Sequence, residues 1–224
     1  MQVASVPMTI PGAPTTYNAM VQSIFNGIEQ ISNIQITGDT INGQAGWFKA
    51  TATNLGLFDG MLLTSGDINS AVGPNINTGY TGFAQAGAGD TDLTAVMSVN
   101  TFNAFVIELD IVPSDSNISL EYIFASDEYL EFAQIGGTNG FNDCFAFFIT
   151  GNNPVGGIYN KRNFALVPNT NIPVTINNIN CVANNQYYIC NDQNSVGGLG
   201  NVVCNNMSGC PTDNTSTSVE YDGF

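Results

Sequence analysis

Histidine is absent from this sequence of 224 residues, and basic residues are almost absent as well. Three Lys and Arg residues stand against 18 Asp and Glu residues, which gives a formal net charge of −15. Nucleic-acid binding requires basic side chains that displace phosphate counterions, so this composition excludes a nucleic-acid partner, and anionic membranes are repelled for the same reason. Without histidine, Ser-His-Asp and Cys-His catalysis are also excluded. Cations, whether metal ions or basic protein surfaces, are the partners that such a charge favours.

Charged residues of either sign make up only 9% of the chain, whereas about a quarter is usual in soluble domains. Solubility must therefore come from Asn, Thr, Ser, Gln and Gly, a composition typical of extracellular β proteins. No apolar run approaches the ~18 residues of a transmembrane helix, and residues 1–14 lack the basic and apolar blocks of a signal peptide. We therefore expect an extracellular or bacterial cell-surface protein, secreted with its signal peptide removed or outside this sequence, and not inserted directly into a membrane.

The hydrophobic share of 43% is that of a globular domain with a core. One short amphipathic helix is predicted near the N-terminus, from apolar residues spaced three and four apart between Tyr17 and Phe25 and a closing Gly27. Residues 70–92 have no periodicity and are predicted to be a long loop. The remaining signals are short strands separated by turns, at residues 34–36, 60–64, 104–112, 117–125, 144–150, 164–167, 174–176 and 187–189.

Short strands without intervening helices indicate an all-β fold. We expect a single antiparallel β-sandwich of jelly-roll type over residues 1–224, with one short N-terminal helix and long Gly- and Asn-rich loops.

Four of the five cysteines crowd into an Asn- and Gly-rich, loop-like stretch, residues 181–210. In an oxidising compartment this predicts a loop insertion pinned by two disulfides, with three pairings open. Zinc is the alternative, but no two cysteines are spaced C-x2-C and histidine is absent. The fifth cysteine, Cys144, lies in an apolar run and is predicted to be a small buried thiol. The four crowded cysteines are Cys181, Cys190, Cys204 and Cys210.

The acids that could carry chemistry gather on both sides of a Gly-rich loop, residues 136–140, which lets its two ends approach each other. Like carboxylates placed close together repel unless they are protonated, hydrated or bridged by a cation. Oxygen ligands suit a hard ion, and calcium tolerates irregular loop geometry better than magnesium does. We therefore expect a calcium site, to which two acids at the end of the long loop are a second source of ligands. The candidate ligands are Asp127, Glu128, Glu131, Asn142, Asp143, Asp90 and Asp92.

Two other interpretations of these acids stay open. They are solvated turn residues, or they include the paired carboxylates of a glycosidase. Against the glycosidase, nothing in the sequence sets one carboxylate apart as an acid and another as a base, and only Trp47 offers an indole for sugar stacking. We therefore expect no catalytic residues and no enzyme activity.

Several ordered motifs carry a family resemblance, and four such motifs are far more specific than a short pattern. The four are FASDEYLEF at 124–132, FNDCFAFFITG at 141–151, NFALVPN at 163–169 and PVTINNIN at 173–180. Upstream, the supporting motifs are NLGLFDGMLLTSG at 54–66, GPN at 73–75 and DTDL at 90–93. Together they strongly resemble the choice-of-anchor L family of bacterial surface proteins, over nearly the whole chain.

The resemblance implies an exported domain of large bacterial surface or secreted proteins, frequent in the Bacteroidota, and it implies no catalytic activity. The expected function is a non-enzymatic extracellular module for cell adhesion: an adhesin domain or a subunit of an extracellular fibre or assembly, stabilised by calcium and disulfides. Its partners would be other copies of itself, or cell-surface and extracellular-matrix components, including glycans. A calcium-dependent carbohydrate-binding module is the alternative, ahead of a glycoside-active enzyme.

Two departures from the family accompany this resemblance. Residues 181–210 are richer in cysteine than the family leads us to expect. The chain also ends at Phe224, where relatives continue into further strands, so we expect a truncated sandwich with an unpaired sheet edge. Either the rest of the chain or a strand from another copy would complete that edge.

Overall fold

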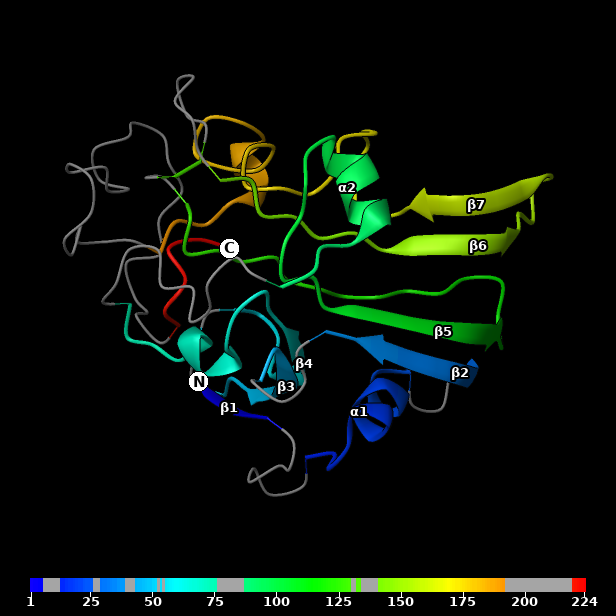
Figure 1. The fold of residues 1–224 in the computed structure, drawn as a ribbon, viewed down its shortest axis with the longest axis horizontal. Coiled ribbons are helices and arrows are strands. Elements are labelled where there is room, and N and C mark those ends of the chain that lie inside the picture. Colours follow the sequence, from blue (N-terminus) through cyan, green and yellow to red (C-terminus); the bar gives the residue numbers. More distant parts are fainter. Residues whose placement is uncertain are drawn as a thin grey trace.

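The computed structural model describes residues 1–5, 13–25, 29–38, 43–51, 53, 55–75, 87–129, 132–133, 141–191 and 219–224. Its elements, in chain order, are β1 (Gln2–Ser5), α1 (Tyr17–Ile24), β2 (Glu29–Thr37), β3 (Ala45–Lys49), β4 (Asp59–Leu63), the 3-10 helix η1 (Ile68–Ala71), α2 (Thr91–Met97), β5 (Val106–Pro113), β6 (Phe148–Asn152), β7 (Ile158–Asn163) and the 3-10 helix η2 (Asn185–Tyr187). Strands predominate over helices, so the predicted mainly β fold is confirmed (Figure 1).

The described strands form three small antiparallel sheets instead of the two large sheets of a sandwich. One sheet has the order β1-β3-β4, β2 pairs with β5, and β6 pairs with β7. In Figure 1, β2, β5, β6 and β7 lie towards one end of the molecule, away from the C-terminus. The described strands therefore show a mainly β fold without the predicted sandwich.

Helix α1 confirms the amphipathic pattern near the N-terminus. The hydroxyl of Thr16 accepts a hydrogen bond from the amide of Ala19 at 3.1 Å, which caps the first turn. Met20 and Val21 are fully buried, as their spacing predicts. The predicted closing residue, Gly27, lies outside the described residues.

The strands predicted at 34–36, 60–64 and 104–112 correspond to β2, β4 and β5, but the later strand predictions are mostly wrong. Residues 117–125 alternate in sequence, yet no described strand pairs with them. Without such a ladder, alternating side chains do not make a strand. The strand predicted at 144–150 begins only at Phe148. The sequence analysis also missed β1, β3, β7 and α2.

Single bridges replace ladders in the second half of the chain. Cys144 bridges to Thr175 and Leu166 to Pro173, so each of the segments predicted as strands at 164–167 and 174–176 forms an isolated bridge and no strand. Tyr187, in the strand predicted at 187–189, belongs to η2 instead. The main core cluster lies largely among these irregular segments, and it includes the pair Tyr129 and Tyr188, whose ring centroids are 4.7 Å apart.

Candidate functional site: a buried acidic cluster

The turn after Phe124 carries two acids into the interior. Asp127 and Glu128 expose only 6% and 7% of their surface. The hydroxyl of Ser126 accepts a hydrogen bond from the amide of Glu128 at 3.0 Å and donates one to Oδ2 of Asp143 at 2.7 Å. One serine therefore joins the two acidic motifs that flank the Gly-rich loop in the sequence.

The last six residues, 219–224, which we call the C-terminal segment, run through the interior beside these acids. The amide of Ser126 donates to the carbonyl of Gly223 at 3.2 Å. Ile189 and Phe224 exchange two backbone hydrogen bonds, of 2.7 and 3.0 Å. Gly223 also bridges to Cys190. Val219 also bridges to Val72. The C-terminal segment therefore pairs with three separate parts of the chain, whereas the sequence analysis expected an unpaired sheet edge near the end.

Side chains hold the C-terminal segment as well. The Nδ2 of Asn191 donates to the carbonyls of Val219 and Tyr221, at 3.1 and 2.9 Å. Asn75 donates to Oδ1 of the fully buried Asp222 at 2.8 Å. At Gly223, a Cβ atom would lie 2.4 Å from the Tyr188 ring, so only glycine fits this close approach.

The C-terminal segment brings a further acid to the buried turn. Glu220 is 3% exposed and acts electrostatically on Asp127. We refer to Asp127, Glu128, Asp143 and Glu220 as the acidic cluster. The sequence analysis did not include Glu220, because the only signal for it, its place two residues before another acid at the end of the chain, says nothing about contact with residue 127.

Burial is the largest of the causes that together raise the pKa of Asp127 to about 8. The neighbouring carboxylates of Glu220, Glu128 and Asp143 add to this rise, in that order. Burial also raises the pKa of Asp143, although the hydrogen bond from Ser126 lowers it in part. Oδ1 of Asp127 is buried and has no hydrogen-bond partner in the described structure. The charged form of this carboxyl is therefore costly unless a proton or a cation neutralises it.

A model of the choice-of-anchor L domain matches residues 9–224 of this sequence. The chain belongs to the choice-of-anchor L domain family. No curated protein and no solved structure matches the sequence. The family indicates a surface-associated bacterial protein. Within the described residues, no helix combines the length and the hydrophobicity that crossing a membrane requires.

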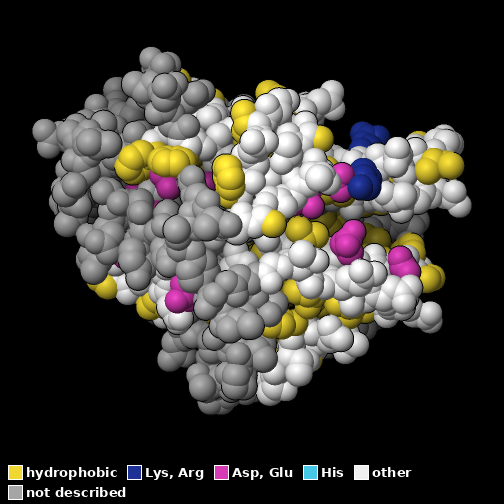
Figure 2. Space-filling model, viewed as in Figure 1, with side chains coloured by type: hydrophobic (Ala, Val, Ile, Leu, Met, Phe, Trp, Pro, Cys, Tyr) yellow, Lys and Arg dark blue, Asp and Glu magenta, His cyan; other side chains and the backbone are white. Residues whose placement is uncertain are grey.

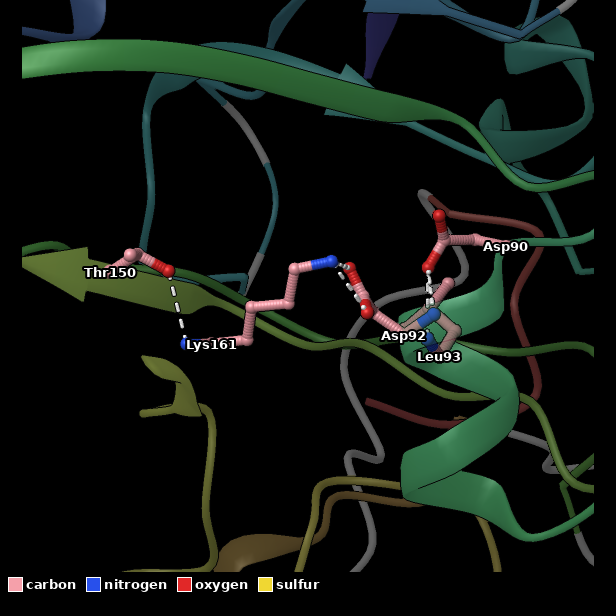
Figure 3. Close-up of polar contacts among 5 residues, drawn as sticks. All are labelled: Asp90, Asp92, Leu93, Thr150 and Lys161. Carbon is pink, nitrogen blue, oxygen red and sulfur yellow. Dashed lines mark hydrogen bonds and ion pairs between the residues drawn. The ribbon is translucent and has the colours of Figure 1, made fainter. Parts of the chain in front are cut away.

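Two of the candidate ligands in this choice-of-anchor L domain lie at helix α2 and have other roles there (Figure 3). Oδ1 of Asp90 accepts hydrogen bonds from the amides of Asp92 and Leu93, both at 2.9 Å, and so caps the helix. Both carboxylate oxygens of Asp92 accept hydrogen bonds from Nζ of Lys161 on β7, at 2.8 and 3.0 Å. Asp92 and Lys161 therefore form an ion pair.

The remaining predicted site residues are placed as follows. Oδ1 of Asn142 accepts a hydrogen bond from the amide of Asn177 at 3.2 Å, which ties the second acidic motif to the core segment. Glu131, Cys204 and Cys210 lie outside the described residues. No group of three or more described acidic or cysteine side chains is arranged as a ready metal site. A cation at the acidic cluster would therefore require its carboxylates to rotate towards one another.

The cysteines of this domain differ in their surroundings. Cys181 and Cys190 are buried in the main core cluster. Cys144 is the free thiol among the described residues. It is half-buried, whereas the sequence predicted a fully buried thiol. Burial and the carboxylates of Asp143 and Asp90 raise its pKa to about 11, so the thiol stays protonated at neutral pH.

Proposed function

We propose that this choice-of-anchor L domain is a non-enzymatic structural module of the bacterial cell surface, an adhesin domain or a subunit of an extracellular assembly. We further propose that calcium at the acidic cluster and disulfides within residues 181–210 stabilise it. The observation that supports this proposal most is the burial of Asp127 and Glu128 beside the C-terminal segment. The turn that carries these acids is hydrogen-bonded to the C-terminal segment, so an ion bound there would join two parts of the chain.

A glycosidase needs two carboxyl groups that face its substrate from opposite sides of a bond. Asp127 and Glu128 expose 6% and 7% of their surface, and the turn that carries them is hydrogen-bonded to the C-terminal segment. The burial therefore argues for a structural role and against bond cleavage.

Calcium is the proposed ion because the cluster consists of oxygen ligands and lies on irregular chain segments. Asp127, Glu128 and Asp143 line one large cavity, so a small ion has space to enter. Two of the three basic residues have contacts of their own: Lys161 pairs with Asp92, and the guanidinium of Arg162 lies 5.5 and 5.2 Å from the ring centroids of Tyr159 and Phe164. Figure 2 shows the basic side chains of this face gathered at one place, over β7.

The disulfides are proposed on similar grounds. Cys181 and Cys190 are buried in the core cluster, and of the described cysteines Cys144 is the free one. The other two cysteines of the predicted disulfides, Cys204 and Cys210, lie outside the described residues. A disulfide in a small secreted domain typically contributes about 2–5 kcal/mol. Mass spectrometry of the unreduced protein should find both bonds, and a thiol count of five in denaturant would contradict the proposal.

Thermal unfolding with and without calcium tests the central part of the proposal. The protein is treated with chelator and then unfolded with excess chelator, with calcium, or with magnesium as the control. A calcium concentration of about 100 times the dissociation constant should add about 2.7 kcal/mol to the free energy of unfolding, because the ion binds only the folded state. A midpoint that is the same in all three solutions would rule out a structural calcium ion.

Carbohydrate binding is a second candidate, supported by aromatic side chains that the described surface exposes. Planar rings with one free face are the usual platform for sugars, and they include Phe58, Phe102, Tyr122 and Tyr187, which are 40–73% exposed. A glycan array probed in calcium tests this candidate. An array without any signal would favour the structural assembly instead.

A further inference from the structure

The basic residues Lys161 and Arg162 follow one another on β7 and differ in their contacts. Lys161 pairs with Asp92. The guanidinium of Arg162 lies over the rings of Tyr159 and Phe164, at 5.5 and 5.2 Å from their centroids. It makes no hydrogen bond or ion pair with another described residue. The two rings hold this exposed guanidinium in place, and its N–H donors stay open to a carboxylate from another molecule.

Apolar side chains at the turn of the same hairpin face solvent. Val155, between β6 and β7, is 90% exposed, and Ile158, the first residue of β7, is 74% exposed. No other large apolar side chain that the structure describes is more exposed than these two. Arginine and aromatic side chains are enriched at the centres of protein–protein interfaces, where they are packed against apolar groups. We call Val155, Ile158 and Arg162 the basic patch, and it has the composition of a protein-binding surface.

The turn after β5 lies at the same end of the molecule and carries the opposite charge. In Figure 1, β5 and β6 end, and β7 begins, at the end away from the C-terminus. Asp115 lies in this turn and is exposed, and its Oδ1 accepts hydrogen bonds from the neighbouring Ser116 at 2.5 and 3.1 Å. No described basic side chain pairs with this carboxylate. Val112, on β5 just before the turn, is 62% exposed. We call Val112 and Asp115 the acidic patch.

A surface with one basic and one acidic patch fits a second copy of itself. When a twofold axis relates two copies, the basic patch of each copy meets the acidic patch of the other, and both contacts form at once. An anionic polysaccharide fits less well, because it offers no positive charge to Asp115. The net charge of −15 repels a second copy at long range, so association depends on the local contacts between the patches.

We propose that this end of the domain is an interface between two copies of the chain, in which Arg162 of each copy pairs with Asp115 of the other. Val155, Ile158 and Val112 pack around these two pairs. The inference rests on the assembly function proposed above, to which it adds a partner and a surface, and it does not depend on calcium. Small interfaces of this kind are weak, so we expect a dissociation constant between about 1 μM and about 1 mM. Copies held close together on one cell surface reach such concentrations.

Sedimentation equilibrium of the whole chain, from about 1 μM to about 1 mM, measures the association. The weight-average mass should rise from that of one chain towards that of two. Hydrogen–deuterium exchange of the wild type then locates the contact. At the high concentration, the amides of residues 112–116 and 153–163 should exchange at least threefold more slowly. The amides of β1 and β3, which lie nearer the C-terminus in Figure 1, serve as the internal control and should not change.

Charge reversal tests the proposed pairs. Arg162→Glu and Asp115→Arg each place like charges opposite one another and should raise the dissociation constant at least about tenfold. An equimolar mixture of the two variants should associate as the wild type does, because the two reversed charges meet at one contact and the native pair remains at the other. Asp59→Arg is the matched control, since it makes the same change of charge at an exposed residue of β4, and it should associate at least as tightly as the wild type.

The outcomes separate this inference from the proposed function. A wild-type chain that stays monomeric up to about 1 mM overturns the inference, whereas the unfolding experiment with calcium decides the structural proposal by itself. A wild-type dimer that Arg162→Glu leaves unchanged, or two variants whose mixture stays monomeric, also overturns it. If a variant does not fold, the exchange experiment on the wild type decides, and equal exchange of residues 153–163 at both concentrations overturns the inference.

Discussion

Two groups of acids in this domain have similar sequence patterns and opposite surroundings. Asp90 and Asp92 lie two residues apart at the start of α2, and Asp127 and Glu128 lie in the turn after Phe124. The first pair meets amide hydrogens and Lys161, and the side chain of Asp92 is 33% exposed. The second pair is buried, with Glu220 and Asp143 as its electrostatic neighbours.

The difference shows what decides the role of an acid in this chain. Near α2, helix amides and one of only three basic residues satisfy the charge, so the acids need no ion. In the turn, the electrostatic neighbours that raise the pKa of Asp127 are other carboxylates, those of Glu220, Glu128 and Asp143. The tertiary structure, more than the spacing of the acids, makes one group a cap and ion pair and the other a candidate cation site.

The largest expected effect is a pH dependence of stability that comes from Asp127. Its pKa is about 8 in the folded protein, against a usual value of 3.8. Because the folded state holds a proton that the unfolded state has lost, the free energy of unfolding in chelator should fall as pH rises from about 4 to about 8. The slope from one such group is at most about 1.4 kcal/mol per pH unit. Urea unfolding at several pH values, in chelator, measures it.

The control for this prediction uses the other group of acids. Asp127→Asn should flatten the slope between pH 4 and pH 8, because the amide does not titrate. Asp92→Asn should leave the slope as it is in the wild type. Equal slopes in the wild type and in Asp127→Asn would mean that the buried turn does not take up a proton on folding, and the contrast between the two groups would then fail.

The sequence predicts which acids of the turn and of the next motif lie close together, but it does not predict which distant residues bury them. The motifs at 124–132 and 141–151 predicted that Asp127, Glu128 and Asp143 would approach each other, and the hydroxyl of Ser126 does link two of them. Glu220 was missed because it follows Asp143 by 77 residues, and no local pattern reports a contact over that separation. Burial of the last residues was missed for the same reason.

The fold shows the same limit. Strands β2, β4 and β5 could be predicted because each carries a local apolar pattern. Residues 117–125 have an equally clear alternation, but a strand also requires a partner, and the described structure supplies none. The amphipathic helix predicted near the N-terminus is confirmed as α1, since the spacing of its apolar residues is a local signal.

A smaller effect is expected from the cap of α2. Asp90→Ala removes the two hydrogen bonds that Oδ1 accepts from the amides of Asp92 and Leu93. Loss of such a cap typically costs about 1 kcal/mol. Asp90→Asn is the control, because an asparagine side chain still caps a helix. Urea unfolding in calcium should place Asp90→Asn near the wild type. A large loss of calcium affinity in both variants would instead indicate that Asp90 is a ligand.

The smallest effect is expected from the exposed ion pair between Asp92 and Lys161. Their contact raises the pKa of the Lys161 ammonium, so the pair forms, but the lysine is largely in solvent, and such pairs contribute little to stability. Lys161→Met should therefore leave the unfolding midpoint nearly unchanged, and any difference should disappear at 1 M salt, where charges are screened. A clear loss of stability that persists in salt would show that Lys161 holds α2 to β7 by packing. The two groups of acids would then be more alike, because the position of each would depend on packing by the surrounding fold and not on charge alone.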